Sequence, residues 1–145
     1  MKKFKYRLKA LERKRAWEKQ SARQDMIEAK DELEEMKYQE QLKTAAADEA
    51  AEQVRKMAGE DSIINPESFF MALNYMAIKR EDADKSVSNT QKAQSVYDEK
   101  FAEYVDADRN VKAVEKHKEN DFSKYLFEQN IEFYKESDDM WLSRK

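Results

Sequence analysis

Few side chains in this sequence could perform acid–base, nucleophilic or metal chemistry, and they are scattered. The single histidine, His117, stands beside Lys118 in a polar stretch, which is typical of a solvated helix residue. Acid pairs such as Asp138-Asp139 follow from an acid-rich composition, and an acid pair alone specifies no reaction. We see no cysteine, glycine-rich phosphate loop, zinc-ligand spacing or nucleophile elbow. We therefore expect a protein that is not an enzyme, with no cofactor, no metal and no small-molecule substrate.

The composition points to long helices as the only framework. The 145 residues include one glycine and one proline, and 41% are charged. A sheet protein of this length would need about a dozen turns, which depend on glycine and proline. Seven Phe, seven Tyr and two Trp are too many for a solvated, disordered tail. The longest apolar run, Phe69 to Leu73, is far shorter than the roughly 20 residues of a membrane-spanning helix. No apolar stretch follows the basic N-terminus, so we expect a soluble, cytoplasmic protein.

The two breakers divide the chain into two helices. We expect a first helix at about 3–58, a connection at 59–65 and a second helix at about 66–142. Gly59 fits the position just after a helix, and Asn65 before Pro66 reads as an N-cap. So short a connection makes the helices antiparallel neighbours. The predicted fold is all-α: an antiparallel two-helix coiled-coil hairpin whose C-terminal helix is longer.

Apolar residues with coiled-coil spacing mark the expected contact between the helices. In the first helix they are Ala22, Met26, Ala29, Leu33, Met36, Ala47, Ala50, Val54 and Met57. In the second they are Phe69, Leu73, Met76, Ala83, Val87, Tyr97, Phe101, Tyr104 and Val111. An earlier set that begins at Phe4 is out of phase, which predicts a stutter near residues 15–22.

Charge and apolar residues are both concentrated at one end of this hairpin. The segment Lys2 to Arg23 has ten bases and two acids, a net +8, and the rest of the chain has a net −11. The longer helix also continues past the expected partner of Phe4, near residue 120. Its last part carries Phe122, Tyr125, Leu126, Phe127, Ile131, Phe133, Tyr134, Met140, Trp141 and Leu142. Such apolar residues indicate an interface, unless the first helix or a second copy of the chain covers them.

The basic segment has several interpretations. It could follow nucleic-acid phosphates, with Phe4, Tyr6 and Trp17 stacking on bases. It could lie on anionic lipid, sit in an acidic protein socket, or be only a solvated face. The apolar stretch Phe69 to Ile78 is too broad for one helix stripe, so its excess is covered by Ile63 and Ile64 or offered to a partner.

The opening residues Phe4-Lys5-Tyr6-Arg7-Leu8-Lys9-Ala10-Leu11 resemble the start of the FliJ family, small coiled-coil proteins of the bacterial flagellar type III export apparatus. The length, the break before Asn65-Pro66-Glu67-Ser68-Phe69 and a charged tail with Glu136, Asp138, Asp139 and Arg144 are similar too.

The resemblance implies a fold similar to the two-helix stalk of the rotary ATPase gamma subunit. It implies insertion into the export ATPase hexamer, binding to the export-gate protein in the membrane, and escort of export chaperones. The protein would be cytoplasmic and peripherally associated with the inner-membrane export apparatus, and no nucleic acid is expected. The gate-binding stripe of the family falls on Phe69, Leu73, Met76 and Arg80, of which the last two depart from its pattern.

On this reading, the ATPase contact lies at the basic and apolar end. Its expected residues are Phe4, Arg7, Leu8, Leu11, Arg13, Arg15, Phe127, Ile131, Tyr134 and Trp141. Three alternatives remain: the equivalent stalk of a virulence secretion injectisome, a nucleic-acid or membrane-surface coiled coil that uses the basic end, and a homodimeric coiled coil without a ring partner.

Overall fold

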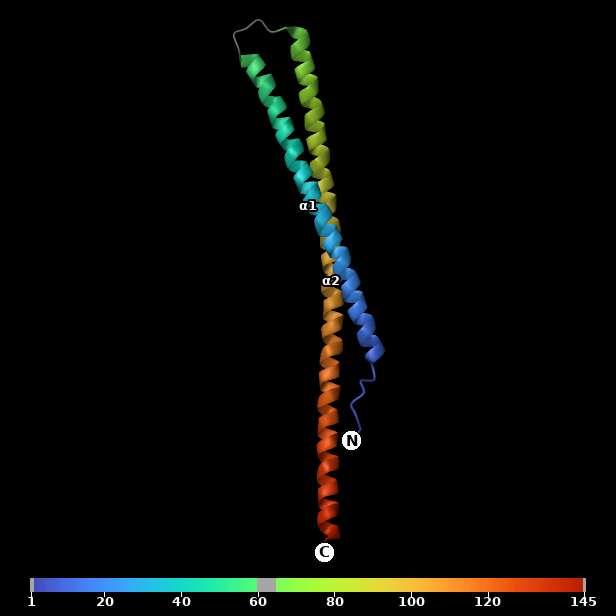
Figure 1. The fold of residues 1–145 in the computed structure, drawn as a ribbon. Coiled ribbons are helices and arrows are strands. Elements are labelled where there is room, and N and C mark those ends of the chain that lie inside the picture. Colours follow the sequence, from blue (N-terminus) through green and yellow to red (C-terminus); the bar gives the residue numbers. More distant parts are fainter. Residues whose placement is uncertain (1, 60–64, 145) are drawn as a thin grey trace. The chain divides into compact units, whose positions relative to one another are not determined.

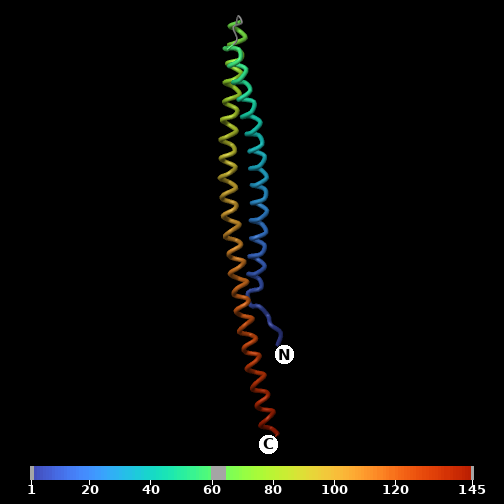
Figure 2. Tube along the Cα trace, turned by 90° about the vertical axis from the view of Figure 1, so that its left-hand side faces the viewer, coloured from blue at the N-terminus to red at the C-terminus, as the bar shows by residue number. Residues whose placement is uncertain are grey.

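The computed structural model describes residues 2–59 and 65–144, and almost all of them lie in two long helices (Figure 1). Helix α1 spans Lys9–Gly59 and helix α2 spans Pro66–Ser143. They pack against each other as an antiparallel hairpin, and the described residues contain no strand (Figure 2). The predicted all-α hairpin is confirmed, including the greater length of the second helix, which has 78 residues against 51.

Local sequence signals set the start of α2. The backbone N–H of Glu67 donates to the side-chain oxygen of Asn65 at 3.1 Å, and the N–H of Phe69 donates to the Asn65 carbonyl at 3.1 Å. Asn65 is therefore the predicted N-cap, with Pro66 as the first helical residue, where its missing N–H costs nothing. The end at Ser143 is one residue beyond the expected one. Residues 60–64 of the connection, with Ile63 and Ile64, lie outside the described residues.

Both predicted ends of the first helix need correction. The helix begins at Lys9 rather than near residue 3, and residues 2–8 are not helical. Gly59 is the last residue of α1 and its φ is not positive, so the expected left-handed position after the helix is wrong for Gly59. Glycine adopts either conformation at low cost, which is why its presence alone did not decide between them.

The hairpin divides into two compact units. One consists of the residues up to Arg23 together with those from Glu103 onward, and the other is Gln24–Ala102. We call them the terminal unit and the middle unit and describe each by itself.

The middle unit has a narrow core of small side chains. Its buried residues are Ala29, Leu33 and Ala50 of α1, with Ala83 and Ser86 of α2. Ser86 Oγ donates to the carbonyl of Ala83 at 2.7 Å, which satisfies its buried hydroxyl. Thr90 Oγ1 lies 3.2 Å from the carbonyl of Met36 on the other helix, a contact between helices that only close packing allows.

The contact line on α2 differs from the predicted one at several positions. Val87 and Phe101 were expected inside, but they are 37% and 47% exposed. Three residues outside the prediction are buried: Ser86, Ala107 and Val114. Regular spacing of alternately four and three residues runs through Ser86, Thr90, Ala93, Tyr97, Lys100, Tyr104, Ala107, Val111 and Val114. The spacing along the helix therefore decided which residues are buried, more than whether their side chains are apolar. The ring of Phe101 lies beside that of Tyr97, with 6.2 Å between ring centroids.

The predicted stutter is visible in the spacing of the half-buried residues of α1. Glu18, Ala22 and Met26 follow one another at two successive intervals of four, in a helix whose other intervals alternate between four and three. The stutter thus lies at residues 18–26 and overlaps the predicted 15–22.

Candidate functional site

The N-terminal segment, residues 2–8, lies against α2 in the terminal unit. Residues 2–6 have no regular secondary structure, and Arg7 and Leu8 form a turn before α1. Phe4 packs between Phe122 and Tyr125, with ring centroids 5.2 and 5.4 Å away. The Tyr125 hydroxyl donates to the carbonyl of Lys2. Side chains alternate along the segment: Phe4, Tyr6 and Leu8 are half-buried, whereas the bases between them are exposed. Strict alternation of apolar and basic residues is typical of an extended chain, and this signal could have been read from the sequence.

Physical reasons favour the late start of α1. Lys2, Lys3, Lys5 and Arg7 would all stand in or before the first turn of a helix, where the macrodipole is positive and disfavours cations. The first helical backbone bond that crosses into α1 runs from the N–H of Glu12 to the carbonyl of Leu8 at 3.0 Å. Glu12 supplies the acid that the first turn favours.

His117 is an exposed helix residue, as predicted, and it also contacts the N-terminal segment. Its Nδ1 lies 2.9 Å from the Tyr6 hydroxyl and 3.8 Å from Asp121 Oδ2. Lys118 Nζ stands 5.8 Å from the centre of the Tyr6 ring, within reach of a cation–π interaction. Desolvation at this contact raises the pKa of Tyr6, and the carboxylates of Asp121 and Glu12 raise it further. The group binds the N-terminal segment, and its residues do not form the nucleophile–base–orienter arrangement of a catalytic site.

Ion pairs join the two helices of the terminal unit. Lys118 Nζ lies 3.2 Å from Glu12 Oε1, and Lys19 Nζ lies 3.0 Å from Asp108 Oδ1. Asp108 also accepts from Lys112 at 2.8 Å, and the hydrogen bonds from Lys112 and Lys19 hold the pKa of this carboxyl below its ordinary value. These ion pairs are partly exposed, so solvent screens them and they add little to the free energy of unfolding. Their main effect is to fix the register between the two helices.

The structure brings the residues predicted to bind the ATPase into one unit but gives them different surroundings. Phe4, Leu8 and Leu11 are half-buried and face inward, so they hold the unit together. Arg7 and Arg13 are exposed. Arg15 is half-buried, with Nη1 2.9 Å from Glu18 Oε2, and so is held in an internal pair.

The last part of α2 remains open to solvent. Every described residue from Asn130 to Arg144 is exposed, Ile131 least among the large apolar ones at 38%. Phe122 and Tyr125 were expected in this part, but they pack on Phe4. The exposed tail of α2, residues 126–142, carries Leu126, Phe127, Ile131, Phe133, Tyr134, Met140, Trp141 and Leu142, which include the four predicted residues Phe127, Ile131, Tyr134 and Trp141.

The predicted gate-binding stripe is half-buried at three of its four positions in the middle unit. Phe69, Leu73 and Met76 are half-buried. Met76 and exposed Arg80 line a groove together with Thr44, Ala47, Asp48 and Ala51 of α1. Two of the four stripe residues, Met76 and Arg80, therefore lie beside α1.

A second apolar surface of α2 lies on the opposite side of the same turns. Phe70 and Met71 are 65% and 72% exposed, and Tyr75 and Ile78 are more than half exposed. At 100° per residue, these four residues centre about 180° away from Phe69, Leu73 and Met76. We call them the outer apolar face. The helical period of the sequence places Phe70 and Ile78 away from the side of α2 that carries Phe69, Leu73 and Met76. It could not show what fraction of each side chain is exposed.

Neither α1 nor α2 carries an apolar stretch long enough to cross a membrane within its described residues. In the described ranges 2–59 and 65–144, no three His, Asp or Glu side chains cluster in a way that could hold a metal ion. When the chain is compared with protein-family models, with curated proteins and with solved structures, nothing matches it. The likeness to the FliJ family therefore stays a prediction from the sequence.

Proposed function

We propose that this chain is a non-enzymatic stalk component of the bacterial flagellar protein export apparatus. It binds the export ATPase hexamer, contacts the membrane export-gate protein and escorts export chaperones. Its place is the cytoplasm, at the inner-membrane export apparatus. The opening Phe4 to Leu11 and the two-helix hairpin support this assignment through their resemblance to the FliJ family.

The observation that carries the ATPase contact is the exposed tail of α2. Eight large apolar residues stand in solvent on a stretch of 17, although one of them, Phe133, borders a groove that Lys2 also lines. An isolated helix in water gains nothing from such residues, whereas a ring lumen that closes around the helix would bury them. The exposed bases Arg7 and Arg13 of the same unit would steer the tail toward an acidic lumen.

The gate contact is better served by the outer apolar face than by the stripe carried over from the family. Phe70, Met71, Tyr75 and Ile78 can be covered by a partner without opening the hairpin. Phe69, Leu73 and Met76 are already half-buried, so a partner would have less of their surface left to cover. We therefore assign the gate contact to the outer face. Arg80 lies on the same side of α2 as Phe69, Leu73 and Met76, so it falls outside this assignment.

The direct test is stimulation of the purified flagellar export ATPase of the same organism. The full chain should co-purify with the ATPase and raise its activity, and a chain that ends at Leu126 should do neither. Circular dichroism should show that the truncated chain keeps the rest of its helix, since the residues removed make no core contact. If the truncated chain stimulates as well as the full one, the tail is not the ATPase contact. If neither chain binds, the assignment to the export apparatus is wrong.

A further inference from the structure

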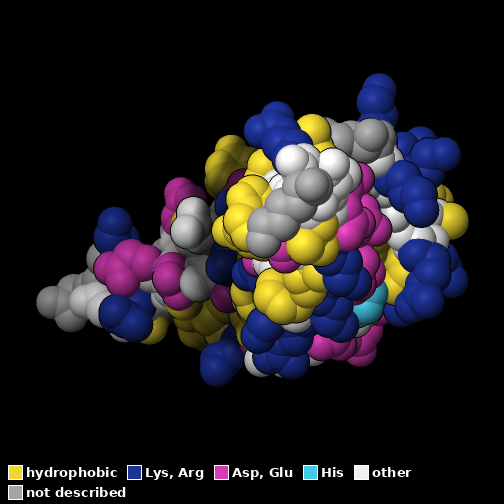
Figure 3. All heavy atoms as spheres, turned by 90° about the horizontal axis from the view of Figure 1, so that it is seen from below, with side chains coloured by type: hydrophobic (Ala, Val, Ile, Leu, Met, Phe, Trp, Pro, Cys, Tyr) yellow, Lys and Arg dark blue, Asp and Glu magenta, His cyan; other side chains and the backbone are white. Residues whose placement is uncertain are grey.

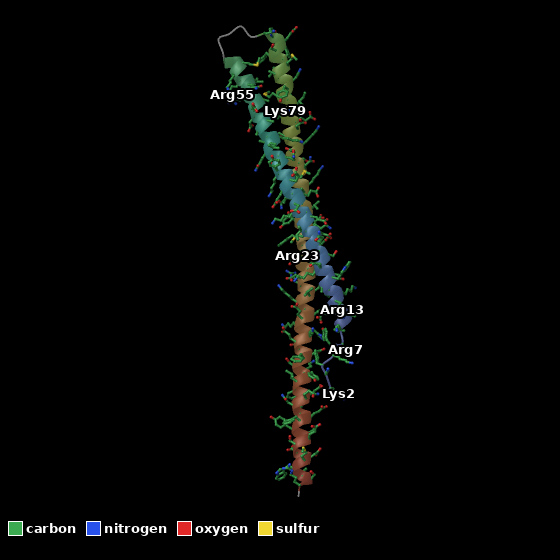
Figure 4. All side chains as sticks on the ribbon, viewed as in Figure 1. Lys2, Arg7, Arg13, Arg23, Arg55 and Lys79 are labelled. Carbon is green, nitrogen blue, oxygen red and sulfur yellow. The ribbon has the colours of Figure 1, made fainter. Side chains whose placement is uncertain are left out.

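The exposed side of Lys2 to Arg23 carries positive charge alone. Its exposed charged residues are Lys2, Lys3, Lys5, Arg7, Lys9, Arg13, Lys14 and Arg23, which we call the basic face. The two acids of this stretch, Glu12 and Glu18, are half-buried and paired with Lys118 and Arg15. Figure 4 shows Lys2, Arg7 and Arg13 one after another along the N-terminal part of the chain. In Figure 3, which views this end of the molecule, Lys and Arg side chains gather along one edge. The packing has thus separated the charges that the sequence mixes.

One large aromatic side chain stands within this face. Trp17 is 70% exposed and follows Arg13 and Lys14 by one helical turn, so the three share one side of α1. An indole beside several bases is the combination found where proteins meet the boundary between lipid headgroups and acyl chains. A purely solvated face would gain nothing from an exposed indole.

The structure weighs against nucleic acid as the partner of this face. Stacking on bases needed Phe4 and Tyr6, but Phe4 packs on Phe122 and Tyr125, and Tyr6 bonds to His117. Only Trp17 is left for stacking. Single-stranded nucleic acid is held by successive aromatic side chains along a groove, which this face lacks among its described residues.

We propose that the basic face binds the surface of an anionic lipid bilayer, with Trp17 at the level of the headgroups. The bases of residues 2–8 are exposed, whereas the side chains of Phe4, Tyr6 and Leu8 are half-buried, and the exposed bases continue along α1. Such an array needs only a plane of negative charge and no shaped socket. A groove beside it is lined by Phe4, Lys5, Tyr6, Lys9, Glu12 and Lys118. Because Lys118 pairs with Glu12, Lys5 and Lys9 are the bases of this groove that a headgroup phosphate would meet. This inference rests on charge and exposure, so it holds or fails independently of the export assignment.

The test uses the full chain with Trp141→Phe, which leaves Trp17 as the only tryptophan. Vesicles of phosphatidylcholine with about 30% phosphatidylglycerol should bind it and shift Trp17 emission to the blue, and pure phosphatidylcholine vesicles should not. Binding should weaken steeply as NaCl rises from about 0.05 M to about 0.3 M, because salt screens the attraction. The proposal is overturned if both kinds of vesicle bind equally, if neither binds, or if Trp17 emission does not change.

Two matched triple variants separate the basic face from total charge. Lys3→Gln with Lys5→Gln and Arg7→Gln lies outside both helices, so the helical content should stay unchanged. At roughly fivefold per base, it should weaken vesicle binding on the order of 100-fold. Lys30→Gln with Lys37→Gln and Lys56→Gln makes the same charge change in the middle unit and should leave binding nearly as in the parent chain. Equal loss in both variants would show an effect of net charge and would refute a defined face.

A duplex DNA that displaces the chain from vesicles at equal phosphate concentration would assign the face to nucleic acid instead.

Discussion

Tyr6 carries its hydroxyl into the contact between the N-terminal segment and α2. There it meets His117 Nδ1 at 2.9 Å, with the Val114 carbonyl 3.5 Å away. Desolvation, Asp121 and Glu12 raise the pKa of the phenol above its ordinary value of 10.0. A phenolate is therefore less favourable in the folded protein than in the unfolded chain.

This shift predicts a loss of stability in alkali. Below the pKa that Tyr6 has in the unfolded chain, both states keep the phenol proton. The contribution of this contact to the free energy of unfolding is therefore fully present there. Above it the unfolded chain ionises first, and the contribution is lost as pH rises through the raised pKa of the folded state. Urea unfolding between about pH 8 and pH 11 should show a steeper decline for the parent chain than for Tyr6→Phe. Tyr38→Phe, at an exposed tyrosine, is the control and should follow the parent.

Gly59 offers a second test at the residue scale. It is helical, its φ is not positive, and a Cβ added there would meet no atom within 4 Å. Gly59→Ala should therefore stabilise the protein by about 0.5 kcal/mol, because the unfolded chain loses freedom while the helix gains a better former. Thermal unfolding measures the change. A destabilised variant would mean that Gly59 takes the left-handed position after the helix.

Some of these contacts could be predicted from single residues and others could not. Asn65 and Pro66 fixed the start of α2, because capping is decided within a few residues. Tyr6 and His117 are 111 residues apart, so no local pattern joins them. The non-helical character of residues 2–8 could be predicted from the alternation of basic and apolar residues, but we expected the helix to continue through them.

At the scale of elements, the contact between α1 and α2 is held by spacing more than by bulk. Ser86 and Ala107 are buried while Val87 and Phe101 beside the line are exposed, since small side chains let the helices approach. Apolar type alone therefore selected the wrong residue at two turns. The register between the two helices follows from how their side chains pack. In the sequence, only the spacing of alternately four and three residues indicates this register.

Two double variants on α2 should separate the core side of the helix from its outer side. Phe69→Ala with Leu73→Ala removes half-buried side chains and should lower the free energy of unfolding by roughly 2–4 kcal/mol. Phe70→Ala with Tyr75→Ala changes the outer apolar face and should alter it by less than about 1 kcal/mol. Chemical denaturation measures both.

Binding to the export-gate protein should show the opposite order. At a temperature where both variants are folded, the outer-face variant should lose most of its affinity and the core variant little. If the core variant alone loses binding while it remains folded, the stripe of Phe69 and Leu73 is the gate site after all. The outer face would then need another explanation.

At the scale of the whole molecule, charge and apolar surface are divided between two parts of the terminal unit. The basic face lies on residues 2–23, and the exposed tail lies at residues 126–142 of α2. Long-range attraction mainly sets how often partners meet, whereas buried apolar contacts mainly set how long they stay together. The two parts should therefore affect different rate constants for binding to the ATPase.

Arg7→Glu with Arg13→Glu and Lys14→Glu should slow association with the ATPase and reduce its salt dependence. Arg15 is left unchanged because it is half-buried and its Nη1 lies 2.9 Å from Glu18 Oε2, whereas Lys14, 67% exposed, lies 3.9 Å from the same carboxylate. Removal of residues from Phe127 onward should instead speed dissociation and end stimulation of the ATPase. Surface plasmon resonance at two salt concentrations resolves both effects, with Lys30→Glu, Lys37→Glu and Lys56→Glu as the matched charge control. If the reversed chain associates as fast as the parent, steering by the basic face plays no part in ring binding, and that face is free for the lipid surface alone.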